Sequence, residues 1–453
     1  MSLAPARKAA LACLRRVRER EAFGAETLDA VLRAAGLSAG DTALATRIAY
    51  GALQTLGTLD EVIDRFLERP ERVEPAVRDA LRLATYELLY MRTPARAAVH
   101  EGVEAAKSVR PQAAGLANAV LRKVAAQAAT FPWGDPDVDD EALARATGHP
   151  LWLTRMWIGE LGRERAAEVL TADLEPAPLY LWANPFKGSP VEIMDMLATD
   201  GAEPVADVLP GSIKALRPQA AVRGRAVAEG YALITDAAAQ VAPRAVAAAP
   251  GSLIVDVASG RGTKTAQIQA ACVAAGTPCD LYALDLHAFK ADVLARRMRE
   301  LGVPGVTPLV GDATDLASVA GLPEAGTVDG VLLDAPCSGL GALRRRPEKR
   351  WRVVPEDLSR LAALQLALLT SVASLVRVGG RVVYSTCSVS RTENRDVVAA
   401  FLDASGGAFR AVGLQSAVPA QWNEFVTEEG YFQSLPHRDG PDGHFVAALE
   451  RMR

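Results

Sequence analysis

The chain contains few of the residues that build disulfide-rich or metal-binding proteins. Only five of its 453 residues are cysteine, and they are scattered without paired metal-ligand spacing. An odd, scattered set favours reduced thiols in the cytoplasm over a disulfide framework. We therefore expect Cys272 and Cys279 to be packing residues, and the sequence predicts no metal site.

Long apolar runs are also absent. No stretch approaches the roughly 20 apolar residues that a membrane helix needs, and the N-terminus lacks the apolar core of a signal peptide. The sequence therefore predicts neither a membrane protein nor a secreted one. Half of the residues are hydrophobic and 23% are charged, which is typical of a globular chain and not of a disordered one.

The net charge is small, because 50 basic residues face 54 acidic ones. This balance does not by itself indicate nucleic-acid binding, but the charge is unevenly distributed. Residues 1–130 carry 19 Lys and Arg against 15 Asp and Glu, and residues 344–352 carry six bases beside Glu348. A local basic patch attracts RNA even when the total charge is acidic. A general bias towards arginine explains the same counts, so both interpretations stay open.

The length predicts two or three domains, because 453 residues exceed what one ordinary core organises. Residues 1–130 show apolar side chains at three- and four-residue spacing, which predicts a helical bundle. The proline- and acid-rich segment 131–148 predicts a linker. Residues 149–230 mix helical and strand patterns and predict a small α/β adaptor, and residues 231–453 predict a larger α/β domain.

Short apolar runs alternate with helical stretches after about residue 251. The runs are rich in Val, Leu and Ile, and the stretches between them have helical periodicity. This alternation predicts a doubly wound, mostly parallel sheet, whose ligands bind at the carboxyl ends of the strands. The predicted strands are "SLIVDVA", "DLYALDL", "VTPLVGDA", "DGVLLDAP", "GGRVVYSTC" and "HFVAALER".

Polar residues follow the first three of these strands. In the turn "DVASGRGTKT", glycines let the backbone approach a ligand, and amides at a helix start favour negative groups. Asp285 ends the second strand and is placed to accept hydrogen bonds from two ribose hydroxyls, with a helix N-cap as the alternative. Asp312 follows the third strand and suits an adenine amino group or a turn cap. Jointly these features predict a nucleoside site that fits S-adenosylmethionine better than a pyrophosphate cofactor.

Two cysteines occupy matching places, because Cys337 and Cys387 each follow an apolar run and precede a serine. Carbon 5 of a pyrimidine is a poor nucleophile, but a thiolate that adds to carbon 6 makes it able to attack a methyl sulfonium. The reaction then needs an acid near the ring and a group that assists release, which fits Asp334 and a second cysteine. Packing is the alternative for either cysteine alone.

The motifs around these residues resemble those of a known family. "DAPCSGLG" followed by "RRRPEKRW", and "YSTCSVSRTENRDVV", are similar to the two cysteine motifs of RNA cytosine-5 methyltransferases. "ALRLATYELLYM", "AVHEGVEAAK" and "LANAVLRKV" are similar to the NusB-like RNA-binding domain that precedes the catalytic domain in the RsmB/Sun branch. "EGYALITDAAAQ" and "DGHFVAALE" also match that branch, so the resemblance spans nearly the whole chain.

The resemblance implies an all-α NusB-like bundle, a small α/β adaptor and a Rossmann-like class I methyltransferase domain. It implies a cytoplasmic enzyme, here expected as a monomer, that methylates RNA, with small-subunit ribosomal RNA as the expected substrate. By motif match, Cys387 is the nucleophile, Cys337 assists product release and Asp334 is a third catalytic residue. The cofactor-binding residues implied are Ala258, Ser259, Gly260, Arg261, Gly262, Thr263, Lys264, Asp285, Asp312 and Asp334.

One motif departs from the family pattern. The family has Cys-Ala-Ala-Pro-Gly-Gly-Lys after the first strand, where this chain has "ASGRGTK". Lys264 is kept, but Arg261 and Thr263 replace the proline and one glycine. This departure bears on the affinity and pose of the donor and supports a rival interpretation, an inactive RNA-binding assembly protein. Transfer RNA is an alternative substrate, and a thiol-redox protein is disfavoured because no Cys-x-x-Cys is present.

Overall fold

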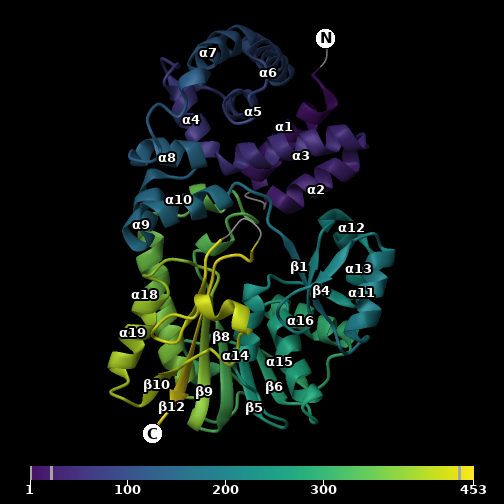
Figure 1. Ribbon diagram of the computed structural model, residues 1–453, viewed down its shortest axis with the longest axis vertical. Helices are drawn as coiled ribbons and strands as arrows, with labels where there is room; N and C mark the ends of the chain where they lie inside the picture. The colour runs from purple at the N-terminus through teal and green to yellow at the C-terminus, as the bar shows by residue number, and fades with distance from the viewer. Residues whose placement is uncertain (1–2, 21–23, 437–439) are drawn as a thin grey trace. The chain divides into compact units, whose positions relative to one another are not determined.

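The computed structural model describes residues 3–20, 24–436 and 440–453, and this part of the chain forms two compact units (Figure 1). The helical unit comprises the chain up to Pro176 together with Leu343–Pro355. The α/β unit comprises Ala177–Ala342 and Glu356–Arg453. The helical unit is therefore discontinuous in sequence, because one of its segments lies within the second half of the chain.

The helical unit is built from amphipathic helices around one apolar core. Helix α1 shows the pattern, since Ala10, Cys13, Leu14 and Val17 are buried at three- and four-residue spacing. Pro75 stands at the start of α5, where the missing N–H costs nothing. The helices are α1 (Pro5–Arg20), α2 (Gly24–Ala35), α3 (Ala39–Gln54), α4 (Leu56–Asp64), α5 (Pro75–Leu89), α6 (Ala95–Val109), α7 (Ala114–Gln127), α8 (Asp140–Thr147), α9 (Leu151–Leu161), α10 (Arg163–Ala172) and α17 (Lys349–Arg352).

The helical unit extends beyond residue 130, where the sequence analysis placed the end of the bundle. Helix α8 lies within the segment predicted as a linker. Asp139 caps its start by accepting a hydrogen bond from the Glu141 amide, and Gly148, in a left-handed conformation, ends it. Helices α9 and α10, predicted as part of the adaptor, belong to this unit. The part of the predicted adaptor that lies in the α/β unit therefore begins at Ala177.

A small antiparallel sheet opens the α/β unit. Its strands are β1 (Leu179–Ala183), β2 (Pro204–Ala206), β3 (Ser212–Ala215) and β4 (Ala232–Ile234), in the order β2-β3-β1-β4. Helix α11 (Pro190–Thr199) begins with a capping box between Ser189 and Glu192, and α12 (Pro218–Arg223) and α13 (Arg225–Ala228) follow β3. The sequence analysis placed a small α/β adaptor at residues 149–230, and these strands and helices begin at Leu179 within that range.

The main sheet has the order β10-β12-β9-β8-β5-β6-β7, with β11 paired to β12 (Figure 1). Strands β9, β8, β5, β6 and β7 are parallel, and β12 is antiparallel to both β9 and β10. The predicted doubly wound, mostly parallel sheet is confirmed. The strands are β5 (Leu253–Val257), β6 (Asp280–Asp285), β7 (Val306–Val310), β8 (Val328–Asp334), β9 (Val376–Thr386), β10 (Phe409–Val412), β11 (Phe432–Ser434) and β12 (His444–Arg451).

Helices cover both faces of this sheet. One apolar cluster joins the sheet to α18 (Pro355–Ala373) and α19 (Arg395–Ala404), and others join the opposite face to α14 (Val241–Ala245), α15 (Thr263–Ala274) and α16 (Ala288–Leu301). Burial on both faces explains why the central strands are nearly continuous runs of Val, Leu and Ile. None of the helices described is long and apolar enough to cross a membrane.

Candidate active site

Two cysteines and an aspartate meet at the carboxyl ends of β8 and β9. These strands are parallel neighbours, and Asp334 lies opposite Ser385 in their register. Asp334 ends β8, Cys337 follows three residues later, and Cys387 comes directly after β9. The two sulfur atoms are 3.3 Å apart, and neither cysteine belongs to a disulfide. The structure thus brings together the three residues to which the sequence analysis gave catalytic roles.

The two thiols are electrostatically unequal. The hydrogen bond with Cys387 raises the pKa of Cys337 well above its usual range, and burial and the charge of Cys387 act in the same direction. Cys337 therefore keeps its proton. Because the thiolate is the nucleophilic form of cysteine, a protonated Cys337 is the weaker candidate for attack.

An ion pair lies beside the cysteines. Lys264 Nζ is 2.6 Å from Asp334 Oδ2, so a side chain at the start of α15 reaches the end of β8. Burial alone would lower the pKa of Lys264, but the charge and hydrogen bond of Asp334 and the charge of Cys387 raise it. Lys264 therefore stays cationic and stabilises the carboxylate of Asp334. The sequence analysis assigned Lys264 to the donor turn, but the structure shows its side chain paired with Asp334 at the cysteine site.

Ser385 and His444 extend this polar edge, and the sequence analysis did not identify either of them as a site residue. The hydroxyl of Ser385 is 3.3 Å from Asp334 Oδ1 and 2.9 Å from His444 Nε2. Burial, assisted by the charge of Lys264, lowers the pKa of His444 to about 3. His444 is therefore neutral near pH 7. Only the pairing of β12 with β9 brings it here, and that pairing is not visible in the sequence.

The predicted donor turn joins β5 to α15. Ala258, Gly260 and Gly262 all have positive φ, a conformation that costs a non-glycine residue strain. A Cβ added at Gly260 would meet no atom closer than the Ala258 carbonyl oxygen at 3.8 Å, so the turn leaves open space there. Below it, burial raises the pKa of Asp256 to about 7, and Asp256 Oδ2 accepts a 2.5 Å hydrogen bond from Thr265. A half-buried glycine turn beside open space fits a nucleoside ligand.

The structure accommodates the residues that depart from the family motif. Arg297 on α16 donates to the Arg261 carbonyl at 2.8 Å and to the Thr263 hydroxyl at 3.1 Å. Gly262, which the chain keeps, has a φ of +75°, a conformation that strains any residue with a side chain. The turn therefore retains its glycine geometry, and its two substituted residues are held by a single arginine.

The two acids predicted to contact the donor have different surroundings. Asp285 is buried and accepts hydrogen bonds from the Gly260 amide at 3.2 Å and the His287 amide at 3.1 Å. It therefore links the glycine turn to the start of α16. Asp312 is exposed and caps a turn by accepting from the Thr314 amide and hydroxyl, which also lower its pKa. Both the ligand role and the turn role of Asp312 are compatible with this position.

Cys272 and Cys279 are buried packing residues, as expected, but the expectation that they are reduced was wrong, because they form a disulfide. Both are buried in the same apolar cluster, and their Cα atoms are 5.8 Å apart. Cys272 lies on α15 and Cys279 precedes β6, so a short turn between helix and strand brings them together. Sequence spacing alone does not reveal such a local return of the chain. Among the residues described, no group of three or more His, Cys, Asp or Glu side chains is arranged to hold a metal ion.

The arginine-rich segment that follows the Cys337 turn belongs to the helical unit. Arg344 and Arg350 are buried, and Arg350 donates to the Gly148 and Asp173 carbonyls at 3.2 and 3.1 Å. The Trp351 indole donates to the Gln54 carbonyl at 2.9 Å. Two arginines of the predicted basic patch are therefore buried and fix the segment in the helical unit, whereas Arg346 and Arg352 are exposed.

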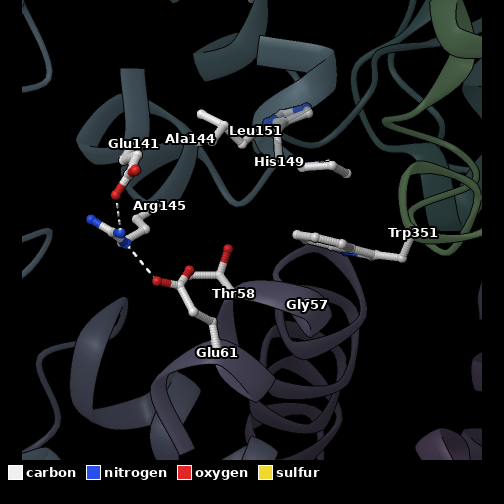
Figure 2. A pocket seen from close by; sticks show the side chains of 10 residues that line it. Gly57, Thr58, Glu61, Glu141, Ala144, Arg145, His149, Leu151 and Trp351 are labelled. Atoms are coloured by element: carbon white, nitrogen blue, oxygen red, sulfur yellow. Dashed lines mark hydrogen bonds and ion pairs between the residues drawn. The ribbon is translucent and has the colours of Figure 1, made fainter. Parts of the chain in front are cut away.

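Two hollows in the helical unit differ in charge. One has a volume of about 270 Å³. In it Arg145 lies between Glu61 and Glu141, whose carboxylates neutralise its charge (Figure 2). The other, of about 760 Å³, is called here the basic groove, because two acids and four bases line it. Its basic residues are Arg69, Arg72, Arg110 and Lys123. Arg110 is paired with Glu74, and the excess of positive charge makes this groove the better match for RNA phosphates.

Comparison with known proteins agrees with this site. Residues 244–450 match the family model described as 16S rRNA methyltransferase RsmB/F, and residues 4–126 match the NusB family. The chain is 32% identical to "Probable ribosomal RNA small subunit methyltransferase B" of Bacillus subtilis over 98% of each chain. It is 34% identical to ribosomal RNA small subunit methyltransferase B of Thermus thermophilus, covering 94% of this chain and 92% of the relative.

A solved structure extends the match to the fold. The crystal structure of the protein named PH0851 gives a TM-score of 0.82 at 25% identity and covers 100% of both chains. Sequence relatives across nearly the full length, the family model and the sheet with its paired cysteines therefore agree. The chain belongs to the RsmB/F family of rRNA methyltransferases, with a helical NusB region before the methyltransferase domain.

Proposed function

We propose that the chain is an S-adenosylmethionine-dependent RNA cytosine-5 methyltransferase that acts on small-subunit ribosomal RNA. One observation carries the proposal: two thiols lie 3.3 Å apart at the ends of adjacent parallel strands, next to the Lys264–Asp334 ion pair. A methyl transfer to a nucleophilic oxygen or nitrogen would need no such pair. Transfer to carbon 5 needs one group to add to the ring and another to remove a proton.

The unequal thiols match the first step of that reaction. Cys387 adds to carbon 6 as a thiolate, the new sulfur–carbon bond moves an electron pair towards carbon 5, and that carbon takes the methyl group. S-adenosylmethionine supplies this methyl group as a sulfonium. Lys264, paired with Asp334, stabilises the thiolate before attack, and Asp334 acts beside the ring of the target base.

The second step uses Cys337. Once Cys387 is a neutral thioether, the hydrogen bond and the charge that raise the Cys337 pKa are gone. Cys337 then releases its proton to water and accepts the proton from carbon 5. The electron pair of that carbon–hydrogen bond expels Cys387 as a thiolate, so one proton per turnover reaches solvent and both cysteines return to their starting state.

The donor and the RNA are assigned from separate features. The positive-φ turn at Gly260 and the buried Asp285 support a nucleoside-bearing donor. The names of the relatives and the 16S rRNA family model support a small-subunit rRNA substrate over transfer RNA. The basic groove supports RNA contact by the helical unit.

A direct test compares rRNA from a deletion strain with rRNA from the same strain complemented by the wild-type gene or by Cys387→Ala. Bisulfite sequencing should show one cytosine of the small-subunit rRNA that is protected only by the wild-type protein. Protection restored by Cys387→Ala would contradict the covalent mechanism. If the deletion strain loses a protected cytosine in transfer RNA and none in rRNA, the proposal that the substrate is rRNA is contradicted.

A further inference from the structure

A carboxylate with no solvent exposure, Glu393, lies between the two cysteine turns. Ser338 donates to it twice, from its amide to Oε1 at 2.8 Å and from its hydroxyl to Oε2 at 2.5 Å. Ser388 donates its hydroxyl to the same Oε2 at 2.6 Å. Each serine directly follows one of the two cysteines, so a single side chain holds the turn of Cys337 and the turn of Cys387.

Further bonds fix Glu393 itself. Gln365 on α18 donates to Oε1 at 3.1 Å and also to the Pro336 carbonyl at 2.9 Å. The Tyr384 hydroxyl donates to the Glu393 carbonyl oxygen at 2.5 Å. Four donors around one buried carboxylate are what such a group needs to offset the loss of water. The carboxylate is thus held rigidly by the groups around it.

Other contacts between the two turns are weaker as constraints on the sulfur atoms. The Gly341 amide donates to the Cys387 carbonyl at 3.0 Å, but this bond joins backbone atoms and does not involve Cys337. The Ser338 and Ser388 hydroxyls are 3.1 Å apart. Each hydroxyl has a single proton, and the bonds to Glu393 use both protons. Control of the distance between the sulfur atoms therefore depends chiefly on the serine–glutamate–serine bridge.

We propose that Glu393 is a positioning residue that sets the geometry of both cysteines through Ser338 and Ser388. This proposal rests on the proposed function, because it assigns separate consequences to the two halves of the bridge. The Ser338 half controls elimination by Cys337, and the Ser388 half controls addition by Cys387.

Chemistry explains why a glutamate is needed. A glutamine of the same shape would replace one acceptor oxygen by an amide that donates. With its oxygen facing the Ser338 backbone N–H, the glutamine would present its amide NH2 to the Ser338 and Ser388 hydroxyls, which would then have to accept where they now donate to a charged oxygen. Glu393→Gln should therefore lower kcat about a hundredfold, the scale expected when reacting groups are misplaced by about 1 Å. Affinity for S-adenosylmethionine should stay unchanged.

The two serines provide the sharper test. Ser338→Ala should slow elimination, so that a covalent protein–RNA species accumulates about tenfold over wild type on a denaturing gel, because one bond to a charged acceptor is removed. Ser388→Ala should slow addition by about the same factor, so that methyl transfer falls and no covalent species accumulates. A merely structural carboxylate predicts equal effects from both serines, seen as loss of stability.

Ser390 provides a matched control in the same turn. It is also fully buried, but its hydroxyl has no hydrogen-bond partner among the residues described. Ser390→Ala should leave the rate and the covalent species unchanged. The proposal is overturned if Ser338→Ala and Ser388→Ala match this control, or if they share one phenotype, while Cys337→Ala and Cys387→Ala behave as the mechanism requires. If the cysteine variants themselves fail, the proposed function fails first.

Discussion

Arg350 in the helical unit and Glu393 in the α/β unit are both charged residues without solvent exposure, but their surroundings differ. Glu393 is surrounded by four donors, three of which belong to the turns of the reactive cysteines. Arg350 binds two backbone carbonyls, its Nε has no partner among the residues described, and burial lowers its pKa to about 10. The charge of Glu393 is fully hydrogen-bonded at the reaction site. The charge of Arg350 is only partly hydrogen-bonded, and it fixes a segment within the helical unit.

This difference implies that the two units fail in different ways. Changes near the cysteines should alter chemistry while the fold persists, because their neighbours on the sheet are apolar and well packed. Changes around Arg350 should alter stability, because a buried charge or its partner is left uncompensated. Changes in the basic groove should alter only the affinity for RNA.

Cys387→Ala should have the largest effect, a complete loss of methyl transfer. Without addition at carbon 6, carbon 5 of the base stays unreactive. The thermal midpoint and the affinity for S-adenosylmethionine should stay near those of wild type, because a small side chain after a strand end contributes little to the core. Methylation of RNA with tritiated donor measures the loss, and calorimetry checks donor binding. Full methylation by this variant would refute the assignment of the nucleophile.

Cys337→Ala should permit addition and methyl transfer but stall elimination. The covalent protein–RNA species should then persist on a denaturing gel with labelled RNA, whereas the Cys337/Cys387 double variant should give none. A covalent species from Cys387→Ala instead would exchange the two roles. Absence of any species from the single variants would leave Cys337 as a packing residue.

Arg350→Met should lower the free energy of unfolding of the helical unit by about 1–3 kcal/mol, because the buried carbonyl groups of Gly148 and Asp173 lose the guanidinium that donates to them. The exposed Arg352 offers the matched control, and Arg352→Met should change stability by about 0.5 kcal/mol or less. Chemical denaturation followed by circular dichroism measures both. Equal, small effects would show that the buried arginine does not stabilise the unit.

Asp285→Ala should weaken binding of S-adenosylmethionine by about 1.5–3 kcal/mol, the usual contribution of hydrogen bonds to a charged group. Affinity for RNA should be unaffected, because this acid belongs to the glycine turn of the α/β unit and the basic groove belongs to the helical unit. Equilibrium dialysis with labelled donor decides the matter. An unchanged dissociation constant would remove the ribose role from Asp285.

The smallest effect is expected in the basic groove. Replacing Arg69 and Arg72 together by glutamine should reduce the slope of log affinity against log salt by about 0.7 for each phosphate that the protein no longer neutralises. Arg110→Gln is the control, because that arginine is already paired with Glu74. Filter binding across a salt series measures the slopes. Identical slopes for wild type and both variants would exclude this groove as an RNA-binding surface.

The sequence predicted the sheet well because its strands are buried on both faces. Strand β8 has four buried Val and Leu side chains among its seven residues, and the neighbouring ends of β8 and β9 follow from the doubly wound order. The placement of Asp334, Cys337 and Cys387 at one edge followed from the same rule. That rule holds because parallel strands share one direction, so their carboxyl ends coincide.

Residues that act through tertiary contacts could not be predicted in this way. His444 reaches the site only because the last strand pairs antiparallel with β9, and Glu393 reaches both turns only once they are folded. Arg350 was part of a basic run that equally suited a solvated RNA-binding surface. The disulfide between Cys272 and Cys279 depends on a local turn that the spacing does not specify.

The discontinuous helical unit has a consequence for the order of folding. During synthesis, residues up to Pro176 emerge long before Leu343–Pro355, which supplies Arg350 and Trp351 to that unit. The indole ring of Trp351 packs against Gly57, where a side chain would leave no room for it. The helices synthesised first therefore lack this packing partner until Trp351 is made. The N-terminal unit therefore cannot be completed until strands β5 to β8 and the turn that carries Cys337 have been synthesised.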